Sequence, residues 1–139
     1  MIRSLGNIGI VCRYIGNYKI AAQHLENASA FIKEIEYKGR KELGFSDVAF
    51  WTKINLYLTY KDLGKAFDDE EIYSLSKKTK CLNYLGNYHL YQLLEDAPFL
   101  ESSYKQVKDK ADKMEDKFKA KFLELKIPAA IVEEWEKVK

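Results

Sequence analysis

Residues 5–28, LGNIGIVCRYIGNYKIAAQHLENA, decide the fold. Their apolar residues recur at intervals of three and four, which places side chains on one face of an α-helix. Gly16 suits the left-handed end of a first helix, and Asn17 can cap a second. The stretch therefore predicts two helices that pack on each other, with glycine and alanine at their closest approach. We expect these residues to face inward: Leu5, Ile8, Gly9, Cys12, Tyr18, Ala21, Leu25, Ala28 and Ile32.

Helical periodicity continues through the chain, and no segment keeps the two-residue alternation of a strand. Ser46 predicts an N-cap, and the helix that follows it ends at Gly64. Asp68 or Asp69 would cap a short charged helix. The segment NYLGN at 83–87 predicts a break, because Gly and Asn disfavour helix interiors. These signals predict an all-α fold.

The last third carries the longest apolar stripe, from Leu100 to Leu125, which predicts one long helix with a bend near 115–117. Pro98 suits its first turn. Residues 128–138 form a short amphipathic helix that we expect to fold back onto the stripe as a cap, with Trp135 well buried. The stripe positions in contact would be Phe118, Phe122 and Leu125. Alternatively, Trp135 lies at an interface with a second copy.

The order of large and small residues in 5–28 resembles the tetratricopeptide repeat, a helix–turn–helix unit of about 34 residues. Leu56, Tyr60 and Gly64 repeat the spacing of Ile8, Cys12 and Gly16. The resemblance implies antiparallel helix pairs stacked as a short α-solenoid, with repeats at 2–38, 46–80 and 84–124 and a capping helix at 128–138. The C-terminal third, YHLYQLLEDAPFLESSYKQVKDKADKM onward, resembles the terminal repeat of bacterial sensory and regulatory proteins.

Composition narrows the function classes. A chain of 139 residues with 47% hydrophobic and 32% charged residues fits one globular domain, spanning 1–139. The net charge of +2 lacks the basic excess that nucleic-acid binders usually show. No apolar run approaches the length of a membrane span, so we expect a cytoplasmic protein. Cys12 and Cys81 are expected to be reduced core thiols. The first helix lacks a capping signal, so we expect either that the chain is the C-terminal part of a longer protein or that a partner covers its N-terminal face.

No catalytic or phosphate-binding motif occurs in the chain, so the sequence predicts neither an enzyme nor a cofactor. His24 and His89 stand apart from each other and from the cysteines, which disfavours a metal site. The acidic run Asp68–Glu71 could attract a cation. However, a helix N-terminus favours carboxylates for dipole reasons alone.

Tetratricopeptide arrays usually bind a peptide or protein in a concave groove lined by the first helix of each repeat, and such modules are often regulatory. Carried onto this chain, the groove would contain Arg3, Ile10, Arg13, Tyr14, Trp51, Ile54, Leu58, Lys61 and, less securely, His89 and Gln92. Arg, Tyr and Trp are typical binding hot spots. Trp51 and Ile54 could instead pack against neighbouring helices. We expect a monomer or weak homodimer.

A second function class remains open. Arg3, Arg13, Lys53 and Lys61 could contact the phosphates of a nucleic acid, although the balanced charge argues against it.

Overall fold

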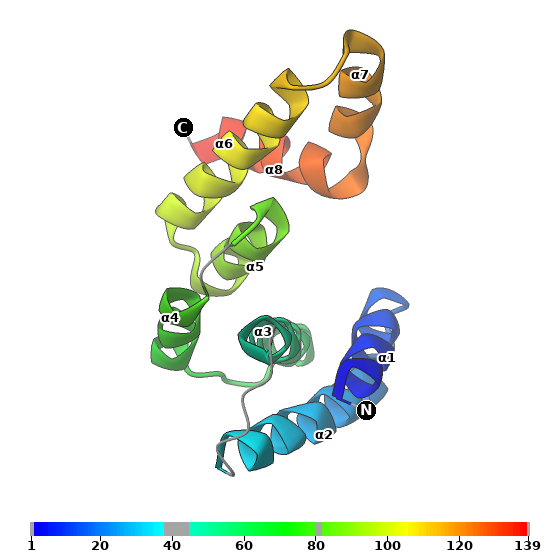
Figure 1. The fold of residues 1–139 in the computed structure, drawn as a ribbon, viewed down its shortest axis with the longest axis vertical. Helices are drawn as coiled ribbons and strands as arrows, with labels where there is room; N and C mark the ends of the chain where they lie inside the picture. The colour runs from blue at the N-terminus through cyan, green and yellow to red at the C-terminus, as the bar shows by residue number, and fades with distance from the viewer. Residues whose placement is uncertain (1, 38–44, 80–81, 139) are drawn as a thin grey trace. The chain divides into compact units, whose positions relative to one another are not determined.

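The computed structural model describes residues 2–37, 45–79 and 82–138 (Figure 1). The side chains at 2–6, 36–37 and 45–47 lie outside this description, as do those of the predicted connection at 38–44 and of Cys81. All elements in the described ranges are α-helices, so the all-α prediction is confirmed. They are α1 (Ile2–Tyr14), α2 (Tyr18–Tyr37), α3 (Phe45–Leu63), α4 (Asp69–Lys78), α5 (Tyr84–Leu94), α6 (Ala97–Asp112), α7 (Asp116–Glu124) and α8 (Lys126–Val138).

The helices form two compact units, which we describe separately: unit 1 is Met1–Lys80 and unit 2 is Cys81–Lys139. In unit 1, α2 packs on α1 and on α3, and α3 packs on α4. Figure 1 shows α1 lying against α2. In unit 2, α5 packs on α6, and α6, α7 and α8 contact one another. Most of these contacts join helices that follow each other along the chain, whereas α1 with α3 and α6 with α8 are packed pairs that do not. A single repeat domain stays a prediction.

Gly9 sets the distance between α1 and α2. A Cβ atom at this position would lie 2.6 Å from Cγ of Leu25, which is fully buried. Four α2 residues predicted to face inward are also fully buried: Ala21, Leu25, Ala28 and Ile32. The prediction is wrong for Ile8, whose side chain is 46% exposed. Ile8 lies one residue before the glycine contact and therefore projects from a different face of the helix.

Substitution of Gly9 by Val is expected to lower the free energy of unfolding by about 1–3 kcal/mol, the usual cost of overpacking a core. The branch point of Leu25 would have to move, and its side chain has no open space to enter. Ala30→Val, at an exposed position of α2, is the matched control and should cost only about 0.5 kcal/mol in helix propensity. Urea unfolding followed by circular dichroism measures both. Equal midpoints for the two variants would contradict the close approach.

The helices α1 and α3 end in the same way. Gly16 has φ of 85° and Gly64 has φ of 75°. The amide of Asn17 donates to the carbonyl of Cys12 at 2.9 Å, and the amide of Lys65 donates to that of Tyr60 at 2.8 Å. Each glycine amide also donates to the carbonyl three residues earlier. These are two Schellman motifs, and they confirm the helix ends predicted at both glycines.

The predicted cap of α4 is also confirmed, because the Asp68 carboxylate accepts a hydrogen bond of 3.0 Å from the amide of Glu70. α3 begins at Phe45, one residue before the predicted N-cap Ser46, whose side chain is outside the described residues.

The predicted break at 83–87 is wrong. Asn83 is instead the N-cap of α5, and its side-chain carbonyl accepts a hydrogen bond of 2.8 Å from the amide of Gly86. Asn87 lies inside the helix, is 5% exposed, and donates to the side chain of Gln106 on α6 at 2.9 Å. A cap and an interhelical bond thus offset the low helix propensity of the segment.

The single long helix predicted from the apolar stripe is two helices. α6 ends at Asp112, and α7 begins at Asp116. The stripe is covered only in part, since Phe122 is 7% exposed but Phe118 and Leu125 are more than half exposed. α8 packs on α6 and α7, with Ile131 fully buried in the core of unit 2. The prediction that α8 folds back is confirmed, although it reaches only the Phe122 part of the stripe.

Trp135 of α8 stacks on Tyr104 of α6 with ring centroids 5.3 Å apart. Because the Trp135 side chain is only half-buried, we expect Trp135→Ala to cost no more than about 3 kcal/mol, the low end for a buried tryptophan. Phe118→Ala, at an exposed position of α7, should change stability by less than about 1 kcal/mol. Thermal unfolding compares the two, and sedimentation velocity follows the oligomeric state. A dimer that Trp135→Ala splits into stable, folded monomers would contradict the capping role.

Candidate functional site

The predicted groove residues of unit 1 fall into three environments. Ile54 and Leu58 on α3 are buried, at 0% and 3% exposed. Ile10, Arg13 and Trp51 are half-buried, whereas Tyr14 and Lys61 are exposed. Arg3 lies in α1, but its side chain is outside the described residues. Ile54 and Leu58 therefore offer a partner little accessible surface.

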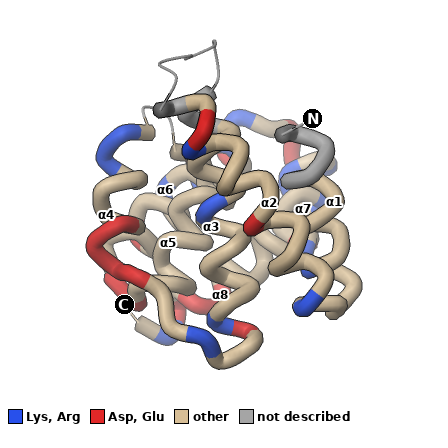
Figure 2. Tube along the Cα trace, turned by 90° about the horizontal axis from the view of Figure 1, so that it is seen from below, with Lys and Arg blue, Asp and Glu red and all other residues tan. Residues whose placement is uncertain are grey.

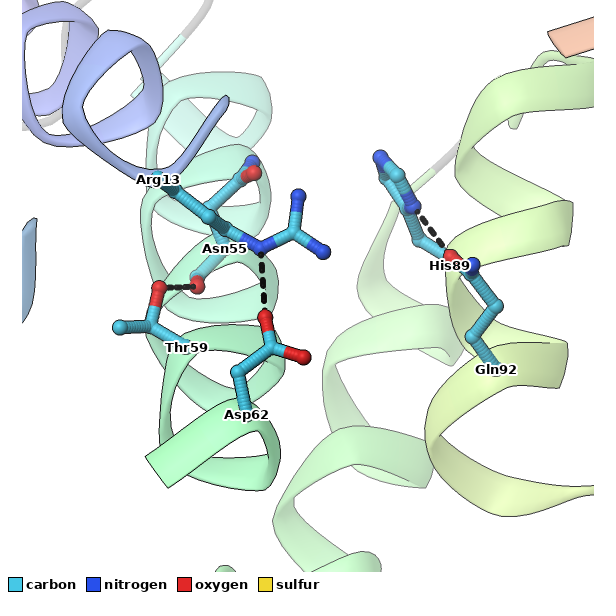
Figure 3. A network of polar contacts seen from close by, with 6 residues as sticks. All are labelled: Arg13, Asn55, Thr59, Asp62, His89 and Gln92. Carbon is cyan, nitrogen blue, oxygen red and sulfur yellow. Dashed lines mark hydrogen bonds and ion pairs between the residues drawn. The ribbon is translucent and has the colours of Figure 1, made fainter. Parts of the chain in front are cut away.

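Arg13 joins α1 to α3. Its Nε lies 3.6 Å from Oδ2 of Asp62 (Figure 3). Its guanidinium also lies 5.8 Å from the centre of the Tyr14 ring. The Arg13 side chain is only 15% exposed. Because the ion pair neutralises a partly buried cation, Arg13 supports the packing of unit 1.

α3 carries a short run of buried polar side chains on one face. Thr59 Oγ1 donates to the carbonyl of Asn55 at 2.7 Å (Figure 3). Asn55 Nδ2 in turn donates to the carbonyl of Trp51 at 2.8 Å. Asn55 Oδ1 is buried and accepts no hydrogen bond from any described residue. Asn55 and Thr59 thus both donate to carbonyls of the preceding turn of α3, so these donors find their partners within the helix itself.

His89 belongs to unit 2, where its side chain is 3% exposed. Its Nδ1 lies 2.9 Å from Oε1 of Gln92, one turn further along α5 (Figure 3). These two predicted groove residues therefore contact each other.

Tyrosine hydroxyls link helices through glutamates in both units. Tyr57 donates to Glu71 of α4 at 2.6 Å, and Tyr60 donates to Glu26 of α2 at 2.6 Å. In unit 2, Tyr91 of α5 donates to Glu134 of α8 at 3.0 Å. The sequence alone does not explain why the chain contains ten tyrosines. In the structure, at least three of them form hydrogen bonds between helices.

These bonds shift pKa values in opposite directions. Burial, with the bond to Glu26, raises the pKa of Tyr60 to about 12, and burial with the bond to Glu71 raises that of Tyr57. For Glu71, burial raises the pKa, but hydrogen bonds from Lys53 and Tyr57 together with nearby positive charges outweigh burial and lower it. Glu71 is therefore ionised at neutral pH and anchors α4 on α3.

Two of the four basic residues considered for nucleic-acid contact form ion pairs. Lys53 Nζ lies 2.7 Å from Glu71 Oε1, and Arg13 faces Asp62. Figure 2 shows the acidic run 68–71 as a continuous red segment at the start of α4. Two members of this run have structural roles, as Asp68 caps the helix and Glu71 binds Lys53. This arrangement does not favour a phosphate-binding surface.

An exposed apolar surface lies on α1 and the turn after it, and the groove prediction named only Tyr14 of its residues. We call it the α1 outer face, and it consists of Ile8, Val11 and Ile15, with Tyr14 beside them. Their side chains are 46%, 58%, 72% and 55% exposed, respectively. The first three are spaced three and four residues apart, so they form one stripe along the helix. No charged residue belongs to it.

The α1 outer face differs from ordinary surface because its large apolar residues are contiguous. Single exposed apolar side chains are common, whereas a contiguous apolar stripe marks an interaction site. Gly9, which contacts α2, projects from a different side of α1. The helix is therefore apolar both where it packs inside unit 1 and where it faces solvent. Sequence periodicity could have suggested this, since α1 carries apolar residues almost all round.

No protein-family model matches the chain, and no curated protein or solved structure matches it either. The tetratricopeptide resemblance therefore stays a prediction. The structure itself shows the all-α fold and the contacts between paired helices. Within the described ranges, no cluster of three or more His, Cys, Asp and Glu side chains could hold a metal ion. In the same ranges, no helix is long and apolar enough to cross a membrane.

Glu71→Gln is expected to lower the free energy of unfolding at neutral pH by about 1 kcal/mol, a value reduced for solvent screening because the carboxylate is 36% exposed. Folding lowers the carboxyl pKa, so its contribution is present above the ordinary value of 4.5 and is lost as the pH falls through the lowered value. The difference between the two proteins should therefore shrink in acid. Urea unfolding across a pH series measures it.

Glu70→Gln is the matched control, because it removes the same charge from the same turn of α4 without breaking the bonds to Lys53 and Tyr57. A stability difference for Glu71→Gln that stays constant from neutral to acidic pH would contradict the assignment.

Proposed function

We propose that this chain is a protein-interaction module, in which unit 1 binds an amphipathic helix of a partner protein through the α1 outer face. The observation that carries the proposal is the stripe of Ile8, Val11 and Ile15, each at least 46% exposed. Its spacing of three and four residues matches the apolar seam along which two amphipathic helices pack on each other. Its lack of charge favours an apolar partner surface over an anionic one.

A repeat architecture, which is itself part of the proposal, would support this function. We propose that α1–α2, α3–α4 and α5–α6 are tetratricopeptide-like helix pairs. In each pair the first helix ends in a left-handed residue: Gly16, Gly64 and Glu95, with Glu95 at φ of 54°. In a stack of such repeats, each pair buries an apolar face against its neighbour. The α1 outer face is the face that a further helix would cover.

The experiment uses an array of synthetic amphipathic helical peptides, with leucines spaced three and four residues apart in differing polar contexts. Peptides that bind the full chain are then titrated against Val11→Lys, which places a charge at the centre of the stripe. We expect affinity to fall roughly thirtyfold or more, as for a hot spot of ~2 kcal/mol. Gln23→Lys adds the same charge at an exposed position of α2 and should leave affinity unchanged.

Equal affinities of the selected peptides for the natural chain and for Val11→Lys would contradict the proposal. Sedimentation velocity over a range of concentrations tests one further outcome, the self-association of the chain. If the chain itself forms dimers that Val11→Lys dissociates into folded monomers, the occupant of the face is a second copy and not a partner helix.

A further inference from the structure

Unit 2 contains a cavity of about 430 Å³ bounded by α6, α7 and α8. All residues that line it belong to this unit. Its apolar lining comes from Tyr104 and Ala111 of α6, Leu123 of α7, and Ala129 and Val132 of α8. The volume lies within the range of about 300–1,000 Å³ typical of small-molecule sites, which are likewise mostly apolar with a few polar groups. The cavity is partly open to solvent and can hold the apolar part of a small ligand against its lining.

The charged side chains at the cavity are not equally engaged. Lys119 Nζ lies 3.0 Å from Oδ1 of Asp112, and Glu133 lies 3.7 Å from Lys137. The structure gives Lys108 no ion pair or hydrogen bond with any residue that it describes. The hydrogen bond from Lys119 and its charge lower the pKa of the Asp112 carboxyl group, and the charge of Lys108, one turn earlier on α6, adds to this shift. Asp112 makes its hydrogen bond and ion pair with Lys119, so Lys108 is the lysine at this cavity that has no described carboxylate in direct contact.

Two other lysines of α6, unlike Lys108, contact a partner side chain. Lys105 pairs with Glu101 at 3.1 Å, and Lys110 lies over the Phe122 ring at 5.4 Å from its centre. An unpaired ammonium beside an apolar cavity favours a ligand that carries one negative charge next to an apolar body. The carboxylates of Asp112 and Glu133 line the same cavity and would repel a second negative charge.

We propose that this cavity binds a small amphipathic monocarboxylate, whose carboxylate contacts Lys108 and whose apolar tail lies among Tyr104, Leu123 and Val132. The volume lies within the range of small-molecule sites, and we take a medium-length aliphatic acid, decanoate, as the probe. This inference concerns unit 2 and is independent of the helix-binding function of unit 1.

Trp135 provides the signal for the test. It stacks on Tyr104, which lines the cavity, so a ligand that displaces water beside Tyr104 should change Trp135 emission. The chain has two tryptophans, and Trp51→Phe in the full chain leaves Trp135 alone. Decanoate is titrated below its micelle concentration, with decylammonium as the probe of opposite charge. Isothermal titration calorimetry of the unsubstituted chain makes the same comparison without a fluorescence variant.

We expect saturable binding of decanoate and roughly tenfold weaker binding to Lys108→Gln, the factor for loss of a hydrogen bond to a charged group. Lys105→Gln removes the same charge one turn earlier, outside the cavity, and should bind decanoate normally. Ala129→Phe fills the cavity and should abolish binding, with circular dichroism to confirm that the variant is folded. Decylammonium should bind at least about tenfold more weakly than decanoate.

Three results would overturn the proposal. These are absence of saturable decanoate binding, equal affinity of the natural chain and Lys108→Gln, and equal affinity for decanoate and decylammonium. Lys108 is a surface residue, so its substitution should leave the fold intact and keep the comparison valid even if Ala129→Phe does not fold.

Discussion

The end of the first helix in each pair is the constraint on which the rest of the structure depends. Gly16 and Gly64 adopt φ of 85° and 75°, where a side chain would be strained. The amide bonds of each Schellman motif then turn the chain back toward the helix it has just left. Only after this reversal can the apolar faces of α1 and α2 meet, with Gly9 against Leu25.

Polar contacts then fix which helix surfaces stay in contact. Tyr60 reaches Glu26 and Tyr57 reaches Glu71, so α3 is bonded to the helices on either side of it in the chain. Such bonds contribute specificity because a buried hydroxyl or carboxylate without a partner is costly. Among the described residues, the side chains of the α1 outer face form no such bond to another helix. The packing of unit 1 therefore leaves this apolar stripe exposed to solvent.

The sequence predicted features that depend on local chemistry, and it failed where distant residues decide. Glycine at a helix end and Asp68 as a cap act within a few residues, so both were correct. The supposed break at 83–87 is helical because Gln106 bonds to Asn87 from another helix. Likewise, periodicity placed Ile54 and Leu58 on α3 without revealing which side the other helices cover. The cavity at Lys108 forms where α6, α7 and α8 meet. The spacing of residues within α6 alone therefore could not predict it.

The contact between Gly9 and Leu25 also has a consequence for how the chain reaches its fold. These residues are close in sequence, so bringing them together restricts only a short loop and costs little chain entropy. Contacts of this local kind are associated with rapid folding, and helix formation and short-loop closure occur within about a microsecond. We therefore expect α1 and α2 to associate early. The apolar stripe on α1 would then be presented to solvent before the later helices have formed.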